Sequence, residues 1–292
     1  MASRARPPLQ AQLAELAAAT AGTFAFYVHD LDSGRRAGVR EQEAFPAASV
    51  IKLPILLRVL EMVQRGTAAL DDPVRLTAWH KTGGAGIFQF FREGLEVTLE
   101  DACTAMVALS DNTATNLLLD VTGVAPVNEL LARLGCGRTR LHRYFGKPEM
   151  PGPPGPSPAV PAEIGRLLEL LARQEMLTPA LCDRAVTILR RQTHRALIPR
   201  YLPEGTPVAH KTGSLDGVRH DAGIVWRPAP GGSARIPPAP PARRRGGLPQ
   251  GAPVVFVGMS RDVPDLRWTV ENAAEIAIAR AARTVFDYFS DE

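Results

Sequence analysis

Strand-like segments lie at the two ends of this chain, and a long block with helical periodicity separates them. Residues typical of strands occur at 23–30, near 36–40, and at 207–212, 221–226 and 253–259. Apolar residues recur at helical spacing in 8–19, 51–65, 98–109, 112–120, 126–134, 161–174, 179–191 and 268–287. This order predicts an α/β (α+β) fold, in which a mostly antiparallel sheet is flanked by N- and C-terminal helices and carries an inserted all-helical domain.

We therefore predict two domains, the number that a length of 292 residues suggests. Residues 1–50 and 206–292 form a discontinuous sheet domain, and residues 51–205 form the helical domain. Two segments show no periodicity. Residues 143–161 form a Pro/Gly-rich loop that is too long for a simple connector. Residues 227–252 are predicted to be a disordered Pro/Gly/Arg insertion between neighbouring strands.

Composition argues against several classes of partner. The net charge is only +4 and the dense basic run is confined to Arg243-Arg244-Arg245, so we expect no nucleic acid. No apolar run approaches the ~18 residues that span a membrane. The three cysteines are scattered, and no metal-binding spacing is present, so we expect no metal and no cofactor. Without an apolar leader we expect a cytoplasmic monomer, or a secreted one if a leader has been removed.

Lysine is unusually scarce, which makes each lysine informative. Of the 34 basic residues only four are lysine, namely Lys52, Lys81, Lys147 and Lys211. Arginine replaces lysine readily on a solvated surface, but a guanidinium cannot lose its proton in a protein. The remaining lysines are therefore candidate sites for chemistry that needs an amine able to change its protonation state.

Ser49-x-x-Lys52 is the first candidate motif. Pro54 is tolerated only in a first helical turn, so a helix should begin near residue 50 or 51. Spacing of three then puts Lys52 on the same face as Ser49, where a desolvated amine can deprotonate the hydroxyl. Taken alone the motif is weak, because Ser49 could simply cap the helix.

Two further motifs follow along the chain. Ser110-Asp111-Asn112 is a rare tripeptide that could also serve as a helix-to-helix junction with capping side chains. Lys211-Thr212-Gly213, followed by Ser214, ends a strand, where a lysine can hold a substrate carboxylate. The residues 80–83 repeat 210–213 as His-Lys-Thr-Gly, but they precede a glycine-rich loop in the helical block, so we reject this copy as catalytic.

In this order, the Ser-x-x-Lys, Ser-Asp-Asn and Lys-Thr-Gly motifs mark serine acyl-transferases that act on β-lactams. From Ala48 to about Trp226, and through the terminal helices, the chain resembles the class A β-lactamase family. The resemblance implies a β-lactamase/transpeptidase-like fold. It also implies a small-molecule substrate, namely a β-lactam or another ester or amide that carries a carboxylate.

The resemblance also implies a role for each matching residue. Ser49 would be the nucleophile, and Lys52 its base or proton relay. Ser110 would pass a proton to the leaving nitrogen, and Asn112 would hold the amide side chain of the substrate. The substrate-binding residues would be Lys211, Thr212, Gly213 and Ser214, with Arg219 or His220 adding carboxylate contacts. The backbone N–H groups of Ser49 and Ser214 would form the oxyanion hole.

The sequence departs from the family in the loop that should supply the deacylating glutamate. Residues 139–144 agree with the family pattern, but Phe145 stands where the glutamate is expected, and no asparagine follows. Glu149 is the only carboxylate of the loop and lies four residues late, so it is the candidate deacylation base. His142 is the other possible base, although it could be structural. Acylation should therefore be intact, and hydrolysis of the acyl-enzyme should be weak.

Three hypotheses follow. The first is a serine hydrolase of the class A β-lactamase type, acylated at Ser49 and hydrolysing its substrate weakly. The second is a cytoplasmic esterase, lactonase or D-Ala-D-Ala peptidase that uses the same site, because these activities need only the nucleophile, its base and the oxyanion hole. The third is a non-catalytic binding protein. Retention of Lys52 and Lys211 in so lysine-poor a chain argues against this last hypothesis.

Overall fold

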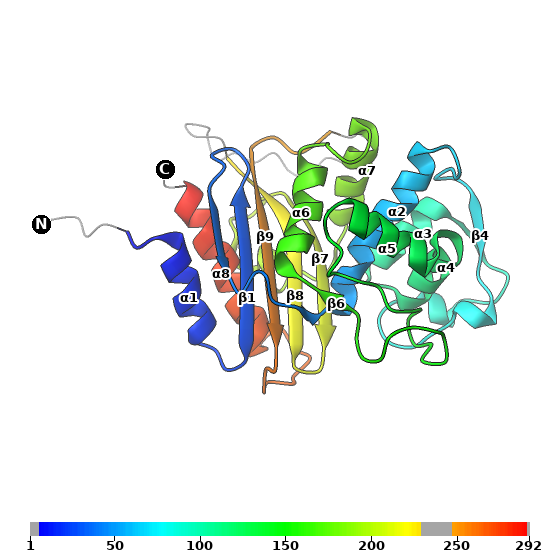
Figure 1. The fold of residues 1–292 in the computed structure, drawn as a ribbon, viewed down its shortest axis with the longest axis horizontal. Coiled ribbons are helices and arrows are strands. Elements are labelled where there is room, and N and C mark those ends of the chain that lie inside the picture. The colour runs from blue at the N-terminus through cyan, green and yellow to red at the C-terminus, as the bar shows by residue number, and fades with distance from the viewer. Residues whose placement is uncertain (1–5, 229–246, 291–292) are drawn as a thin grey trace, which may run out of the picture.

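The computed structural model describes residues 6–228 and 247–290. Figure 1 shows a sheet with helices on both faces on one side of the molecule and a helical part on the other. The helices are α1 (Leu9–Ala18), α2 (Lys52–Gln64), α3 (Leu99–Ala108), α4 (Asn112–Thr122), α5 (Val124–Arg133), α6 (Pro161–Ala172), α7 (Pro179–Leu189) and α8 (Ala273–Ser290). The short 3-10 turns are η1 (Ala48–Ile51), η2 (Ala78–His80), η3 (Phe88–Phe90) and η4 (Ile198–Tyr201). The strands are β1 (Thr23–Asp30), β2 (Arg36–Val39), β3 (Phe45–Pro46), β4 (Pro73–Arg75), β5 (Glu96–Thr98), β6 (Pro158–Ala159), β7 (Val208–Leu215), β8 (Val218–Arg227) and β9 (Ala252–Arg261).

The large sheet combines strands from both ends of the chain. Its order is β2-β1-β9-β8-β7, and every neighbouring pair is antiparallel. The long-range pairing of β1 with β9 places Phe26 opposite Gly258. The fold expected from the sequence is therefore confirmed. Two short ladders, β3 with β6 and β4 with β5, were not expected, because segments of two or three residues carry no periodic signal.

Two boundaries differ from the sequence prediction for identifiable reasons. β7 and β8 run on until Leu215 pairs with Val218, because Asp216-Gly217 forms the tight turn between them. The last helix begins at Ala273 rather than near residue 268, since Asp265 accepts a hydrogen bond from the Ala273 N–H at 2.8 Å. A side-chain acceptor in this place satisfies a backbone donor that the helix leaves unpaired, and so fixes where α8 starts.

The two faces of the sheet pack against different helices. Alternate residues of β1 point to opposite sides, so that Phe24, Phe26 and Val28 join one apolar cluster while Ala25 and Tyr27 join another. The first cluster lies beneath α1 and α8, and the second lies against α6 and the helical part. Burial on both faces is why these strands read as nearly continuous apolar runs.

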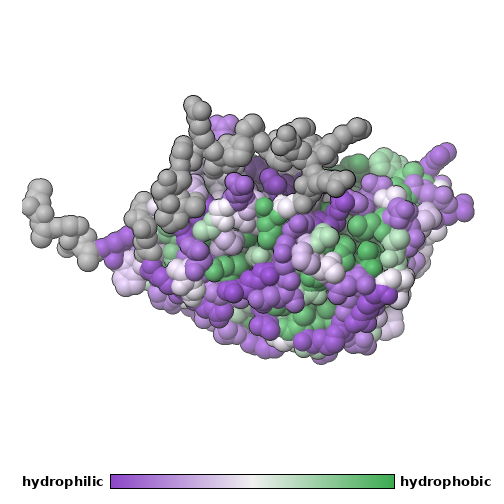
Figure 2. Space-filling model, turned by 90° about the horizontal axis from the view of Figure 1, so that it is seen from above, coloured by the Kyte–Doolittle hydropathy of each residue, from purple (hydrophilic) through white to green (hydrophobic). Residues whose placement is uncertain are grey.

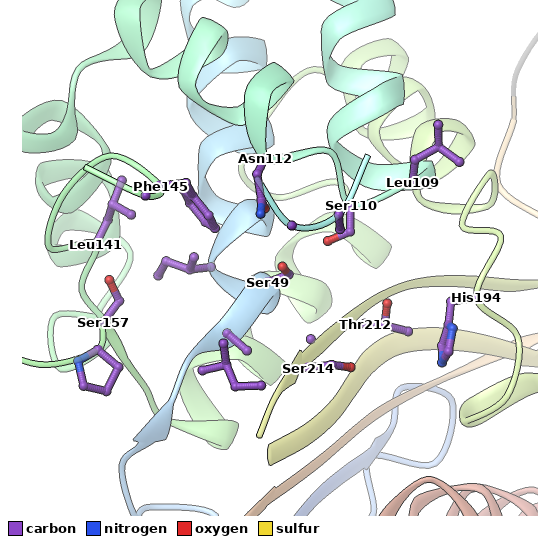
Figure 3. Close-up of a pocket in the computed structure, with 18 of the residues that line it drawn as sticks. Ser49, Leu109, Ser110, Asn112, Leu141, Phe145, Ser157, His194, Thr212 and Ser214 are labelled. Atoms are coloured by element: carbon purple, nitrogen blue, oxygen red, sulfur yellow. The ribbon is translucent and has the colours of Figure 1, made fainter. Parts of the chain in front are cut away.

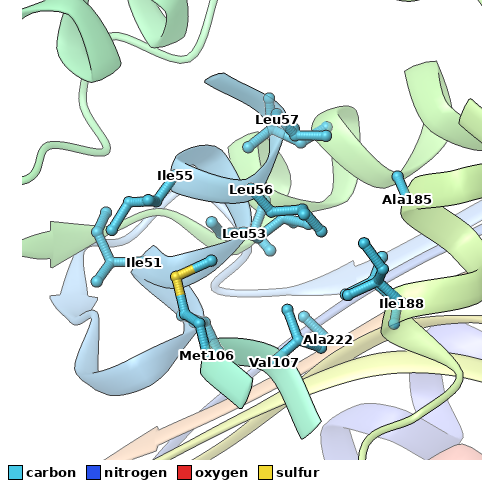
Figure 4. Packing of buried hydrophobic residues seen from close by; sticks show 14 of the residues in the cluster. Ile51, Leu53, Ile55, Leu56, Leu57, Met106, Val107, Ala185, Ile188 and Ala222 are labelled. Atoms are coloured by element: carbon cyan, nitrogen blue, oxygen red, sulfur yellow. The ribbon is translucent and has the colours of Figure 1, made fainter. Parts of the chain in front are cut away.

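Helix α2 runs through the centre of the second cluster and is buried along most of its length. Figure 4 shows its leucines and isoleucines surrounded by side chains from three other elements. Met106 and Val107 come from α3, Ile188 comes from α7, and Ala222 comes from β8. A helix enclosed in this way holds the residues at its N-terminus in fixed positions relative to the sheet.

The domain boundary remains a prediction. Helix α6 falls within residues 51–205, yet it packs against β1, β8 and β9 of the sheet. Of the predicted insertion 227–252, Arg227 and Ala252 pair with each other in β8 and β9, and residues 229–246 lie outside the described residues.

Within 6–228 and 247–290, no helix has the length and apolar character needed to cross a bilayer. The face seen in Figure 2 carries separate hydrophobic patches between hydrophilic residues.

Candidate active site

Ser49 lies in η1, the 3-10 turn that leads directly into α2. The start of helical structure at Ala48 agrees with the position that Pro54 indicated. Strand β7 passes very close to this turn, because a Cβ atom on Gly213 would lie 3.0 Å from the Ser49 nitrogen and 3.1 Å from the Val50 nitrogen. A Cβ atom here would be tight against the backbone, so glycine favours this approach, which brings the Lys-Thr-Gly motif beside the candidate nucleophile.

Lys52 is fully buried and makes three hydrogen bonds to the second motif. Its Nζ atom donates to the Ser110 carbonyl at 2.6 Å, to Ser110 Oγ at 3.2 Å and to Asn112 Oδ1 at 2.7 Å. The Phe145 ring lies 4.7 Å from this amine. Burial, together with the nearby Lys211 charge, holds the pKa of the Lys52 amine well below its usual range. In its neutral form this amine keeps two N–H donors and one lone pair, so that Ser110 Oγ can then donate to it, and the lone pair can accept a proton.

Ser110 connects the two buried lysines. Its hydroxyl accepts hydrogen bonds from Lys52 and, at 3.0 Å, from Lys211 Nζ. The backbone at Ser110 is left-handed, with a φ of 55°. A non-glycine residue in this conformation is uncommon and is often found at functional sites, where the surroundings hold it.

Lys211 is buried beside Ser110 and also donates to the Thr212 carbonyl at 2.8 Å. Burial lowers the pKa of its amine to about 7, although the charge of Asp221 opposes this shift. The charge of Lys211 therefore changes within the physiological range, in contrast to that of an ordinary lysine.

The pKa of Lys211 predicts that the rate of acylation depends on pH. As the pH rises through 7, Lys211 loses its proton and with it the attraction for a substrate carboxylate. We expect acylation by a penicillin, measured relative to its methyl ester, to fall about tenfold between pH 6 and pH 8. The ester lacks the carboxylate and so corrects for titrations that affect the chemical step, and the same ratio in His194→Gln removes the titration of the neighbouring imidazole. Lys211→Arg, which stays charged, should flatten the ratio, and a ratio that is already flat in the unmodified protein would contradict the prediction.

Asp111 has the structural role that the sequence left open. Its side chain caps α4 by accepting the Ala114 N–H at 2.8 Å, and it also accepts the N–H groups of Ile87 and Phe88. Asn112 next to it donates to the Gly83 carbonyl at 3.0 Å. The His-Lys-Thr-Gly copy at residues 80–83 therefore ends in a loop that Asn112 holds through the Gly83 carbonyl.

A cavity of about 930 Å³ brings most of the predicted residues together. Ser49 lies near the middle of the site in Figure 3, with Phe145 and Leu141 on one side and Thr212 and His194 on the other. The predicted residues in its lining are Ser49, Ser110, Asn112, His142, Thr212, Gly213 and Ser214. Lys52 and Lys211 lie beneath this surface and are bonded to it through Ser110.

Besides the two buried lysines, three predicted residues do not line the cavity. Glu149 is exposed on its loop. His220 is buried in the sheet, where its Nε2 lies 2.6 Å from the Pro46 carbonyl and burial lowers its pKa to about 4. Arg219 is also buried and donates to the carbonyls of Leu215 and Arg267. Both side chains are bonded to backbone carbonyls and do not line the cavity, and their contact with a substrate carboxylate stays a prediction.

The backbone of Phe145 is held by a residue that the motifs did not single out. Asn116 Oδ1 accepts the Phe145 N–H at 2.8 Å, and Asn116 Nδ2 donates to the Phe145 carbonyl at 3.0 Å. Asn116 is fully buried on α4. The scarcity of asparagine in the chain was the one signal that could have identified it.

His194 is a second residue that sequence reasoning missed. It lines the cavity near Thr212, and its Nε2 lies 3.5 Å from Glu275 Oε1 of α8. A hydrogen bond to Glu275 raises the pKa of this imidazole, so that it stays protonated to a higher pH than usual. When protonated, His194 therefore forms an ion pair with Glu275, which also lines the cavity. Across residues 6–228 and 247–290, no cluster of three or more His, Cys, Asp or Glu could hold a metal ion.

Comparison with known proteins agrees with this geometry. The model of the Beta-lactamase enzyme family matches residues 8–233. Beta-lactamase L2 of Stenotrophomonas maltophilia is 31% identical over 234 residues, which cover 75% of this chain and 73% of that protein. An ancestral class A β-lactamase structure superposes with a TM-score of 0.79 at 27% identity, covering 97% of this chain and 100% of its own. A PBP-A variant solved as an acyl-enzyme complex with penicillin G gives a TM-score of 0.81 at 26% identity, with 98% and 100% of the chains covered.

Proposed function

The chain belongs to the class A β-lactamase family and is a serine hydrolase of that type. We propose that β-lactams acylate it at Ser49 and that the resulting acyl-enzyme is hydrolysed slowly. The observation that carries the proposal is the pair of buried lysines joined through one hydroxyl beside the nucleophile. These contacts supply a neutral amine and a proton path in a site that also offers backbone donors. Each of these is a requirement for acyl transfer.

In the proposed acylation, the neutral Lys52 amine takes the proton of Ser49 Oγ as this oxygen attacks the lactam carbonyl. The N–H groups of Ser49 and Ser214 stabilise the negative charge on the carbonyl oxygen, at roughly 3–4 kcal/mol per donor. Ser110 passes its proton to the nitrogen as the C–N bond breaks and takes a proton from the Lys52 ammonium, which becomes neutral again. The hydrogen bonds that Ser110 accepts from both lysines support this role.

The remaining polar residues of the cavity hold the substrate in this proposal. Lys211 and Thr212 bind the carboxylate, and His194, whose pKa is raised by its hydrogen bond to Glu275, lies in the same cavity lining. Asn112 binds the amide side chain from the opposite side of Ser49. Its Nδ2 is already anchored on Gly83 and its Oδ1 on Lys52, which supports a fixed orientation.

Slow release follows from the side chain of Phe145. Hydrolysis of the ester needs a base that activates a water molecule near Ser49, and a phenyl ring cannot act as one. Glu149, the only carboxylate of the loop, does not line the cavity. His142 does line it and is the residue that would supply a base if release proved to be fast. A cytoplasmic location and a monomeric state remain predictions.

Intact-protein mass spectrometry after mixing with benzylpenicillin tests the proposal. Because ring opening retains the leaving nitrogen, the protein should gain the mass of the whole drug, keep it for hours, and carry it on Ser49. Ser49→Ala should show no adduct. The three cysteines are buried, so that reaction at a thiol is not expected. Absence of both adduct and drug consumption would refute the nucleophile, and rapid drug consumption by free enzyme would refute slow release.

The same assay separates the alternative hydrolases. An esterase, lactonase or D-Ala-D-Ala peptidase would turn over a carboxylate-bearing ester or peptide at Ser49 while remaining slow toward the penicillin. Turnover of such a substrate that disappears in Ser49→Ala would favour this second function.

A further inference from the structure

Trp268 is a large aromatic residue that remains exposed at the cavity. Its side chain is 65% exposed, and it contributes to the cavity lining. By contrast, Trp226 of the sheet is almost completely buried. An indole ring removes a large apolar area from water when it is covered, so an exposed one at a cavity has much to gain from a ligand.

The ring of Trp268 is held in place rather than free to rotate. Its indole N–H donates to Asp216 Oδ1 at 3.1 Å, and the Arg219 guanidinium lies 4.6 Å from the ring centre. Arg219 is itself buried and fixed, because it donates to the Leu215 carbonyl at 2.6 Å and to the Arg267 carbonyl at 2.8 Å. The buried Arg219 thus supports the ring of Trp268 from one side.

Two further apolar side chains are exposed at the same place. Val270 is 55% exposed and Leu215 is 43% exposed, and both line the cavity. We call Leu215, Trp268 and Val270 the apolar rim. The Trp268 ring has the Arg219 guanidinium on one side and is exposed on the other. Because the ring is already held in place, little conformational entropy is lost when a ligand binds to it.

The apolar rim lies on the leaving-group side of the scissile bond. Asp216, which binds the indole, is two residues beyond Ser214 and follows the end of β7. Asn112 and Phe145 lie on the other side of Ser49, where the acyl side chain is expected (Figure 3). A substrate that places its carboxylate at Thr212 would therefore direct any further group on its leaving portion toward Trp268.

We propose that Trp268 is a specificity-determining residue, and that the preferred substrates carry a planar aromatic group on the leaving portion, next to the carboxylate. This inference rests on the proposed acylation of Ser49. The aromatic group would lie against the open face of the indole ring and contact Val270 or Leu215. Aromatic contacts of this kind favour offset or edge-to-face geometry and add to the gain from apolar burial.

Two cephalosporins with the same acylamino side chain test the inference, one with a methyl and one with a styryl group at the leaving-side position of the ring. The readout is the ratio of their second-order acylation rate constants, styryl over methyl, measured by intact mass. Comparing this ratio between variants cancels the different intrinsic reactivity of the two drugs. We expect Trp268→Ala to lower the ratio about tenfold, and Trp268→Phe, which keeps a ring, to restore most of it.

Phe90 provides a matched control. It is 79% exposed and does not line the cavity, so Phe90→Ala should leave both rate constants unchanged. If Trp268→Ala does not fold, Trp268→Leu carries the same test, because it keeps apolar bulk without a ring and should still lower the ratio. Adducts that form with an unaltered ratio would overturn the inference but not the proposed function. Failure of the unmodified protein to form any adduct would instead overturn the proposed function.

Discussion

Phe145→Glu should shorten the lifetime of the penicilloyl adduct by about 10²–10⁴-fold, the contribution typical of a general base. The ring that it replaces lines the cavity and lies 4.7 Å from Lys52 Nζ. Asn116 holds the backbone at this position through both its N–H and its carbonyl group, so the new carboxylate should point toward the same space. The measurement is the decay of the adduct mass after excess drug is removed.

Two control variants distinguish the effect of a new general base in Phe145→Glu from the effect of a changed side-chain shape. Phe145→Gln has nearly the same size and polarity as the glutamate variant but cannot accept a proton, so its adduct should last as long as that of the unmodified protein. Glu149→Gln should also change nothing, because Glu149 is exposed and away from the cavity. An adduct of Phe145→Glu that persists for hours would mean that some other feature of the loop prevents attack by water.

Lys52→Arg should slow acylation by about 10²–10⁴-fold while preserving a positive charge at the site. The buried amine has a pKa well below its usual range, which lets it act as a base. A guanidinium keeps its proton at any accessible pH, so raising the pH should not rescue the variant. The rate of adduct formation with a penicillin at several pH values is the measurement.

Lys52→Met controls for the larger arginine side chain. It fills a similar volume without an amine, and it should acylate as slowly as Lys52→Arg if proton transfer is what is lost. The thermal midpoint of each variant shows whether it has folded. A Lys52→Met protein that is folded and still acylates at the original rate would require a different base.

The fold and the three motifs were predictable because their signals are repeated or dense. The strands at the two ends and the helices between them extend over many residues, and each motif joins two or three rare residue types. Phe145 was predictable for the same reason, since the residues before it fixed the register of the loop. The two short ladders, by contrast, depend on tertiary contacts that leave no local pattern.

Isolated residues were harder to assign. His194 stands in a segment without periodicity, and Trp268 lies at the start of the predicted helix 268–287 but before α8 as the structure has it, so only the fold brings them near Thr212 and Asp216. Arg219 and His220 show a related difficulty. Both follow a motif strand, but β8 is buried on both faces, and these two side chains bond to the backbone of neighbouring segments. Proximity to a motif in the sequence therefore indicates the strand but not the partners of its side chains.

The pairing of β1 with β9 has a consequence for how the chain folds as it is synthesised. The first strand leaves the ribosome more than two hundred residues before its partner, so it must wait with apolar side chains uncovered. Closing so long a loop is also entropically costly, which slows the formation of a sheet. The turn that carries Ser49 depends on β7 for its close contact with Gly213. The surroundings of the nucleophile are therefore complete only after β7 has been made, more than 150 residues after Ser49 itself.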